Sequence, residues 1–128
     1  MKSEDLMYLA LNIFHEAASE PEDGKIAVGH VVMNRTKLKK FPNTVKEVVL
    51  QEKQFSWTNK DKRPKIHFSE YPALAECFKA AKTVLEMHEN MGLLYDGADH
   101  YHANYCSPYW ISSMVCVRKI GAHIFYRS

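Results

Sequence analysis

The chain has 128 residues, of which 46% are hydrophobic and 25% are charged, and its formal net charge is +2. This composition is typical of folded globular proteins and argues against a disordered chain, and the length predicts a single domain over residues 1–128. The sequence contains no run of about 18 apolar residues and no dense basic cluster, so neither membrane association nor a nucleic-acid partner is expected.

The N-terminal segment, MKSED, carries acidic residues and lacks the apolar run of a signal peptide. The protein is therefore expected to be made in a cytoplasm, whatever compartment it acts in. The three cysteines, Cys77, Cys106 and Cys116, are an odd number with no close-spaced pair. They predict buried thiols in a reducing compartment rather than a disulfide framework.

The first predicted helix begins at Ser3 and carries one apolar stripe. The stripe repeats at helical spacing and consists of Leu6, Leu9, Ala10, Ile13 and Ala17. Glu16 falls at the margin of this stripe, where its carboxyl group would be partly removed from water. Burial favours a protonated carboxyl group, which can serve as a general acid near neutral pH. The sequence therefore marks Glu16 as a candidate catalytic acid; the alternative is a boundary glutamate that reaches water or pairs with a cation.

Three further helices are predicted from their start and stop signals. Residues 19–22, SEPE, have the spacing of a capping box with proline in the first turn, and they open a helix that ends before Phe41. Thr44 and Glu47 form a second capping box, which opens a short helix through Leu50. The longest amphipathic pattern begins within residues 69–72 and ends before Gly92.

Two segments lack helical periodicity. Residues 51–69 predict a long surface loop or a small β-hairpin, and irregular stretches of this length are often functional. Residues 117–126 predict a strand or extended segment with a bend at Gly121.

Two segments, 54–57 and 101–110, combine aromatic side chains with amides and hydroxyls. Aromatic faces pack against sugar rings, and polar groups bond to the ring substituents, so this mixture suits a sugar-binding cleft. The candidate substrate-binding residues are Gln54, Ser56, Tyr101, His102, Asn104 and Trp110. The alternative is that the tyrosines and the tryptophan are core residues with polar tips at the surface.

Two other kinds of site are weakly supported. His100 and His102 would lie on one face of a strand, where Asp96, Asp99 or His123 could join them, but zinc needs three or four ligands and no further metal pattern is present. No metal and no other cofactor is therefore predicted. A nucleophilic Cys106 paired with a histidine is possible on residue types alone, but nothing distinguishes this cysteine from a small core residue.

Six motifs follow one another along residues 6–126. They are HEAASEP (15–21), IAVGHVVMNR (26–35), FPNTV (41–45), QFSW (54–57), YHA (101–103) with Trp110, and IGAHIFY (120–126). In this order they resemble the cell wall hydrolase family typified by the spore cortex-lytic enzymes. The resemblance implies an α+β, mainly helical, lysozyme-like fold with a small β-hairpin or irregular lobe.

The resemblance also implies an activity. Members of this family cleave the glycan strands of peptidoglycan between N-acetylmuramic acid (MurNAc) and N-acetylglucosamine (GlcNAc), as lytic transglycosylases that leave a 1,6-anhydro end. The catalytic glutamate of the family corresponds to Glu16. The chain departs from the common pattern at His15, Ala18 and Ser19, where glycine, arginine and glycine are usual.

Two alternatives remain open at this point. An inverting hydrolase needs a second carboxylate about 6.5–9.5 Å from the acid to hold a water molecule, and Asp61, Asp96 and Asp99 are the candidates, none within a motif. A non-catalytic module that binds wall glycan would use the same aromatic residues. The favoured interpretation is a monomeric enzyme resembling a single-domain bacteriophage endolysin, which acts on the cell wall during host lysis.

Overall fold

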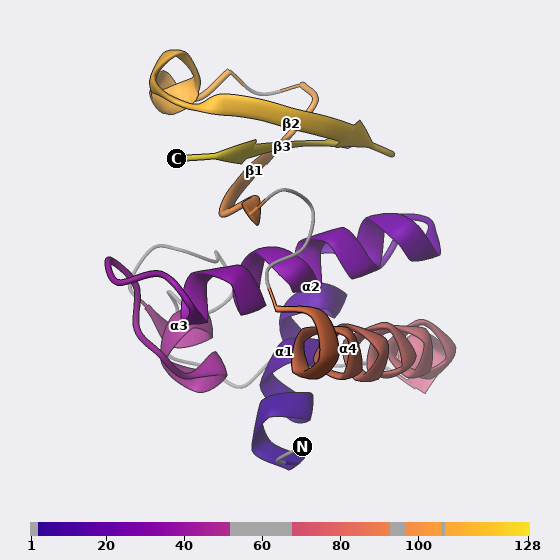
Figure 1. Cartoon of the computed structure of the whole chain (residues 1–128). Coiled ribbons are helices and arrows are strands. Elements are labelled where there is room, and N and C mark those ends of the chain that lie inside the picture. The colour runs from indigo at the N-terminus through magenta and orange to yellow at the C-terminus, as the bar shows by residue number, and fades with distance from the viewer. Residues whose placement is uncertain (1–2, 52–67, 93–96, 106) are drawn as a thin grey trace.

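The computed structural model describes residues 3–51, 68–92, 97–105 and 107–128. The α-helices come first in the chain and the strands last (Figure 1). The helices are α1 (Ser3–Ala17), α2 (Glu22–Thr36), α3 (Val45–Leu50) and α4 (Tyr71–Met91), with 3-10 helices η2 (Phe68–Glu70) and η4 (Tyr109–Ser113). The strands are β1 (His100–Ala103), β2 (Val115–Ile120) and β3 (His123–Arg127). The predicted mainly helical α+β fold is therefore confirmed, whereas most of the segment predicted as a loop or hairpin, 52–67, lies outside the described residues.

The predicted helix starts are confirmed with one difference. The hydroxyl of Thr44 accepts a hydrogen bond from the backbone N–H of Glu47 at 3.2 Å and donates to its carboxylate at 2.8 Å, so the predicted pair caps α3 through the Thr44 side chain. The box predicted at residues 19–22 is wrong, because α2 is preceded by Pro21 and has no side-chain cap. The carboxylate of Glu20 contacts the turn between β2 and β3 instead.

The hydrophobic core lies where α1, α2, α3 and α4 meet. Gly29 of α2 allows these helices to approach closely, since a Cβ atom there would lie 2.8 Å from a methyl group of Val84 and 3.1 Å from one of Ile13. Ile13 and Val84 are fully buried. A larger residue at position 29 would therefore push α2 away from α1 and α4.

The sheet lies against α2 on the side away from α4 (Figure 1). Its strand order is β1-β3-β2, and both pairs are antiparallel. Because side chains alternate along a strand and Tyr101 pairs with Phe125, the sheet has two distinct faces. The inner face, which joins the hydrophobic core, carries Tyr101, Ala103, His123 and Phe125, and the outer face carries His100, His102, Ile124 and Tyr126.

The cysteines only partly agree with the prediction of buried thiols. Cys77 is fully buried on α4, whereas Cys116 is exposed because it lies on the edge strand β2. Cys106 lies outside the described residues. In the ranges that the structure covers, no helix has both the length and the apolar character needed to cross a membrane.

Two histidine rings pack against each other inside the helical core. The ring centroids of His30 on α2 and His88 on α4 are 4.9 Å apart, and both residues are buried. Burial, and then the neighbouring His88, lower the pKa of His30 to about 3. Burial, and then the positive charge of Lys37, lower the pKa of His88 to about 4. Both rings are therefore neutral in the folded protein at neutral pH.

We expect the free energy of unfolding to fall as the pH is lowered from 6.5 towards 4. In this interval the unfolded chain binds protons on both histidines while the folded chain does not, so stability increases with pH. Each histidine contributes a slope of at most about 1.4 kcal/mol per pH unit. Urea unfolding across this pH range measures the slope. His88→Leu should reduce it, and an unchanged slope in that variant would exclude His88 as a source.

Candidate active site

Glu16 lies at the end of the first helix, facing the sheet. It is the penultimate residue of α1 and is half-buried. Its negative charge is close enough to Tyr101 of β1 to raise the pKa of that tyrosine. The partial burial that the sequence predicted for Glu16 is therefore confirmed, and its charge acts on Tyr101, which belongs to the inner face of the sheet.

Tyr101 is the neighbour of Glu16 from the sheet. Its ring packs against Phe125 with centroids 5.6 Å apart and meets the ring of His123 edge-on at 5.2 Å. Burial, and then the charge of Glu16, raise the pKa of Tyr101 well above its usual value of 10, and the cation of Arg35 opposes them. The hydroxyl group consequently remains protonated at neutral pH and is available as a hydrogen-bond donor.

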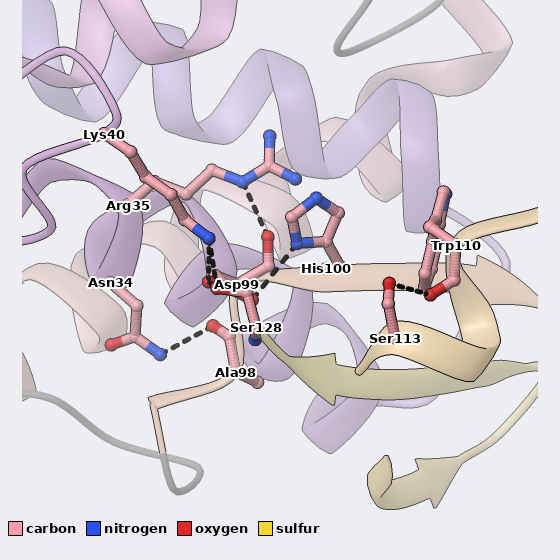
Figure 2. A network of polar contacts seen from close by, with 9 residues as sticks. All are labelled: Asn34, Arg35, Lys40, Ala98, Asp99, His100, Trp110, Ser113 and Ser128. Atoms are coloured by element: carbon pink, nitrogen blue, oxygen red, sulfur yellow. Dashed lines mark hydrogen bonds and ion pairs between the residues drawn. The ribbon is translucent and has the colours of Figure 1, made fainter. Parts of the chain in front are cut away.

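Arg35 brings a buried positive charge from α2 to the same place. Its Nε donates to the carbonyl of Asp99 at 2.8 Å, and the neighbouring Asn34 donates from its side chain to the carbonyl of Ala98 at 2.8 Å (Figure 2). Burial lowers the pKa of Arg35 from its usual value, and Tyr101 and Asp99 oppose this shift. These two bonds fix the backbone that leads into β1, and so they determine where Tyr101 lies.

Asp99, one of the predicted partners for a hydrolytic mechanism, is committed to the fold. It is almost completely buried, and it accepts hydrogen bonds from His100 at 3.1 Å and from the backbone and hydroxyl of Ser128 (Figure 2). Burial alone would raise its pKa, but the bonds from His100 and Ser128 outweigh burial and hold the pKa at about 2. A weakly basic carboxylate with occupied oxygens is a poor base for activating water. Asp61 and Asp96 lie outside the described residues.

Two predicted substrate-binding residues, His102 and Trp110, lie together but on the outer face. Their ring centroids are 5.7 Å apart, and Trp110 also contacts His100 and Tyr126. His102 donates from Nδ1 to the carbonyl of Ala103 at 2.7 Å, so its Nε2 can accept from the Tyr126 hydroxyl at 3.0 Å. The structure therefore brings these residues together on the face of β1 opposite to Tyr101.

The remaining predicted residues are more scattered. Asn104 is exposed at the end of β1, and its backbone N–H donates to the carbonyl of Ala122 at 2.7 Å. Gln54 and Ser56 lie outside the described residues. Within the ranges described, no group of three or more potential ligands is placed to hold a metal ion.

Sequence reasoning missed two polar residues behind Tyr101. Glu20 accepts a hydrogen bond from the backbone N–H of Ala122 at 2.7 Å, and the same carboxylate oxygen lies 3.1 Å from Nδ1 of His123. Both side chains are nearly buried, with 10% and 11% of their surface exposed. The available signal was the presence of Glu20 in the same acidic motif as Glu16.

The family model described as Cell Wall Hydrolase matches residues 19–126, a range that begins just after Glu16. A spore cortex-lytic enzyme of Bacillus cereus is 26% identical over 121 residues, which cover 94% of this chain and 43% of that protein. The chain thus spans about two fifths of the length of this relative.

Two solved structures share the fold. The catalytic domain of the germination-specific lytic transglycosylase SleB from Bacillus anthracis superposes with a TM-score of 0.78 at 24% identity, covering 99% of this chain and 97% of that one. The catalytic domain of the Bacillus cereus SleB protein gives a TM-score of 0.76 at 25% identity, covering 98% and 91%. The lysozyme-like fold implied by the sequence motifs agrees with these similarities.

The proximity of Glu16 to Tyr101 can be tested without any assay of activity. Replacing Glu16 by Gln removes a negative charge that raises the pKa of Tyr101, so the tyrosine should begin to ionise at a lower pH. Nuclear magnetic resonance of ring-labelled tyrosine, with Tyr101→Phe to assign the signal, follows this ionisation. Glu4→Gln, an exposed change at the other end of α1, is the control. An unchanged onset of ionisation in Glu16→Gln would show that the two side chains are not neighbours.

Proposed function

This chain belongs to the cell wall hydrolase family, and from that premise we propose that it is a lytic transglycosylase of peptidoglycan. The proposed reaction cleaves the bond between MurNAc and GlcNAc, with Glu16 as both general acid and general base. The observation that carries the proposal is the position of Glu16 at the end of α1 beside Tyr101. The similarity to a SleB catalytic domain, named as a lytic transglycosylase, supports it.

The first proposed step breaks the glycosidic bond. Neutral Glu16 donates its proton to the glycosidic oxygen, the electron pair of the C1–O bond moves to that oxygen, and positive charge develops at C1 of MurNAc. Glu16 is then a carboxylate. The Tyr101 hydroxyl beside it, together with the Arg35 cation near that hydroxyl, stabilises the new negative charge.

The second proposed step closes an internal ring. The Glu16 carboxylate removes the proton from the C6 hydroxyl of the same MurNAc, and the hydroxyl oxygen attacks C1. The product has a 1,6-anhydro ring, Glu16 is protonated again, and no water is consumed. One carboxyl group therefore serves both steps.

The inverting hydrolase is less well supported than the transglycosylase. Its second carboxylate would have to hold and activate a water molecule, and the carboxylate oxygens of Asp99 are already bonded to His100 and Ser128. A module that only binds glycan would have no need of a carboxyl group beside a buried cation and a desolvated hydroxyl. The cytoplasmic origin, the role in host lysis and the monomeric state stay predictions from the sequence.

Glu16→Gln should abolish nearly all release of muropeptides from purified peptidoglycan. Glutamine has almost the same shape but cannot donate and then accept a proton, and general acid–base catalysis typically contributes about 10²–10⁴-fold. The measurement is the initial rate of release, with circular dichroism to verify the fold and Glu4→Gln as a matched control on the same helix. A folded Glu16→Gln protein that retains a rate within about three-fold of the unmodified protein would exclude Glu16 as the acid.

The released products should carry 1,6-anhydro ends. Because the attacking group belongs to the substrate, each muropeptide should be lighter by about 18 Da, the mass of one water, than the product of a hydrolase. The anhydro end has no reducing group, so treatment with borohydride should leave the mass unchanged. Mass spectrometry of a digest reads both properties at once. Predominantly reducing MurNAc ends would contradict the transglycosylase and indicate a hydrolase.

A further inference from the structure

The carboxylate of Glu20 anchors the turn between β2 and β3 to the junction between α1 and α2. One of its oxygens accepts the backbone N–H of Ala122 at 2.7 Å and lies 3.1 Å from Nδ1 of His123. The turn fits closely around this oxygen, because a Cβ atom at Gly121 would lie only 2.6 Å from it. Gly121 also has φ = +56°, a left-handed conformation that favours glycine. The position of this carboxylate is therefore tightly constrained.

This contact orients the ring of His123. A carboxylate can only accept, so Nδ1 of His123 carries the proton that is donated to Glu20. The His123 ring then lies perpendicular to the Tyr101 ring, with the two planes at 89°. An imidazole fixed by a carboxylate behind it is a common way of orienting a side chain in a functional site.

Tyr101 contacts two rings of β3, which also contact each other with centroids 6.2 Å apart. Phe125 packs against it at 5.6 Å and His123 meets it edge-on at 5.2 Å, and both contacts come from β3. The backbone pairing of β1 with β3 already fixes the strand itself. The additional contact with His123 therefore acts on the direction of the tyrosine ring and its hydroxyl group.

We propose that Glu20 and His123 are positioning residues for glycosidic cleavage, which keep the Tyr101 hydroxyl directed at Glu16 through both steps of the reaction. This inference rests on the proposed function. Small displacements of a catalytic contact reduce turnover strongly, by up to about 10²-fold for a shift of about 1 Å. Loss of the His123 ring should thus lower turnover through Tyr101, although His123 itself need not touch the substrate.

The pH dependence of turnover distinguishes this role from simple structural support. A hydroxyl that donates to Glu16 favours the carboxylate, so a misplaced hydroxyl lets Glu16 keep its proton to higher pH. The alkaline limb of the rate profile should therefore move upward. Among the residues that the structure describes, the charged and titratable groups found next to Tyr101 are Glu16 from α1, Arg35 from α2 and His123 from β3. His123→Gln leaves Glu16, Arg35 and Glu20 in place.

The decisive experiment is a double-mutant cycle between His123→Gln and Tyr101→Phe, read as muropeptide release across the pH range. In the unmodified background His123→Gln should lower the rate about ten-fold and shift the alkaline limb upward. In the Tyr101→Phe background it should change the rate less than about two-fold, because the hydroxyl that it positions is gone. Equal losses in both backgrounds, or an unmoved alkaline limb, would overturn the proposal.

The matched control is His100→Gln, since His100, on the outer face of β1, makes an equally long contact of 3.1 Å to the carboxylate of Asp99. Its effect should be additive with that of Tyr101→Phe, and the alkaline limb should not move. Should His123→Gln fail to fold, Glu20→Gln carries the same cycle, because its amide oxygen can take the place of the carboxylate oxygen that faces both Ala122 and His123 but holds Nδ1 of His123 without a negative charge. Its effect on the rate should be smaller than that of His123→Gln and should again disappear in the Tyr101→Phe background. An active Glu16→Gln protein would reject the proposed function, whereas an inactive one with an additive cycle would reject only the positioning role.

Discussion

The contact between the end of α2 and the backbone before β1 is the constraint on which the site depends. Asn34 and Arg35 donate to two consecutive carbonyl groups, those of Ala98 and Asp99, and all four residues are buried. A buried carbonyl that loses its hydrogen-bond partner costs about 1–3 kcal/mol. Both bonds are therefore kept only when the backbone before β1 lies at one position along α2. Apolar packing alone would let the strand slide, whereas paired donors and acceptors fix its register against the helix.

A second polar contact holds the opposite side of the sheet. Glu20 follows α1 and reaches the turn after β2, so the sheet is attached to the helical part through both α2 and the α1–α2 junction. Tyr101, whose pKa is raised by the charge of Glu16, lies on the inner face of this doubly attached sheet. The geometry of the proposed reaction is therefore supported by groups that never need to contact the glycan.

Local patterns in the sequence predicted the helices and the half-buried place of Glu16 at the margin of α1, because stripes and capping boxes depend on residues a few positions apart. The contributions of Arg35, Glu20 and His123 depend on contacts between residues 64 to 103 positions apart, which leave no periodic signal. The same limit explains the wrong cap at residues 19–22, since Glu20 is engaged by a distant turn. Strand alternation, applied to the YHA motif, would have separated Tyr101 from His102, which lie on opposite faces.

The order of strands in the sheet also governs how the site is assembled during synthesis. β3 follows β1 and β2 in the chain but lies between them, and β1 and β2 do not pair with each other. A nascent chain that has emerged from the ribosome only as far as β2 can form its helices but has no central strand on which to build the sheet. Tyr101 then lacks both of its ring neighbours, Phe125 and His123. Glu16 is synthesised early, yet the residues around Tyr101 are complete only when β3 has emerged. A chain that is still being synthesised therefore lacks the assembled candidate site.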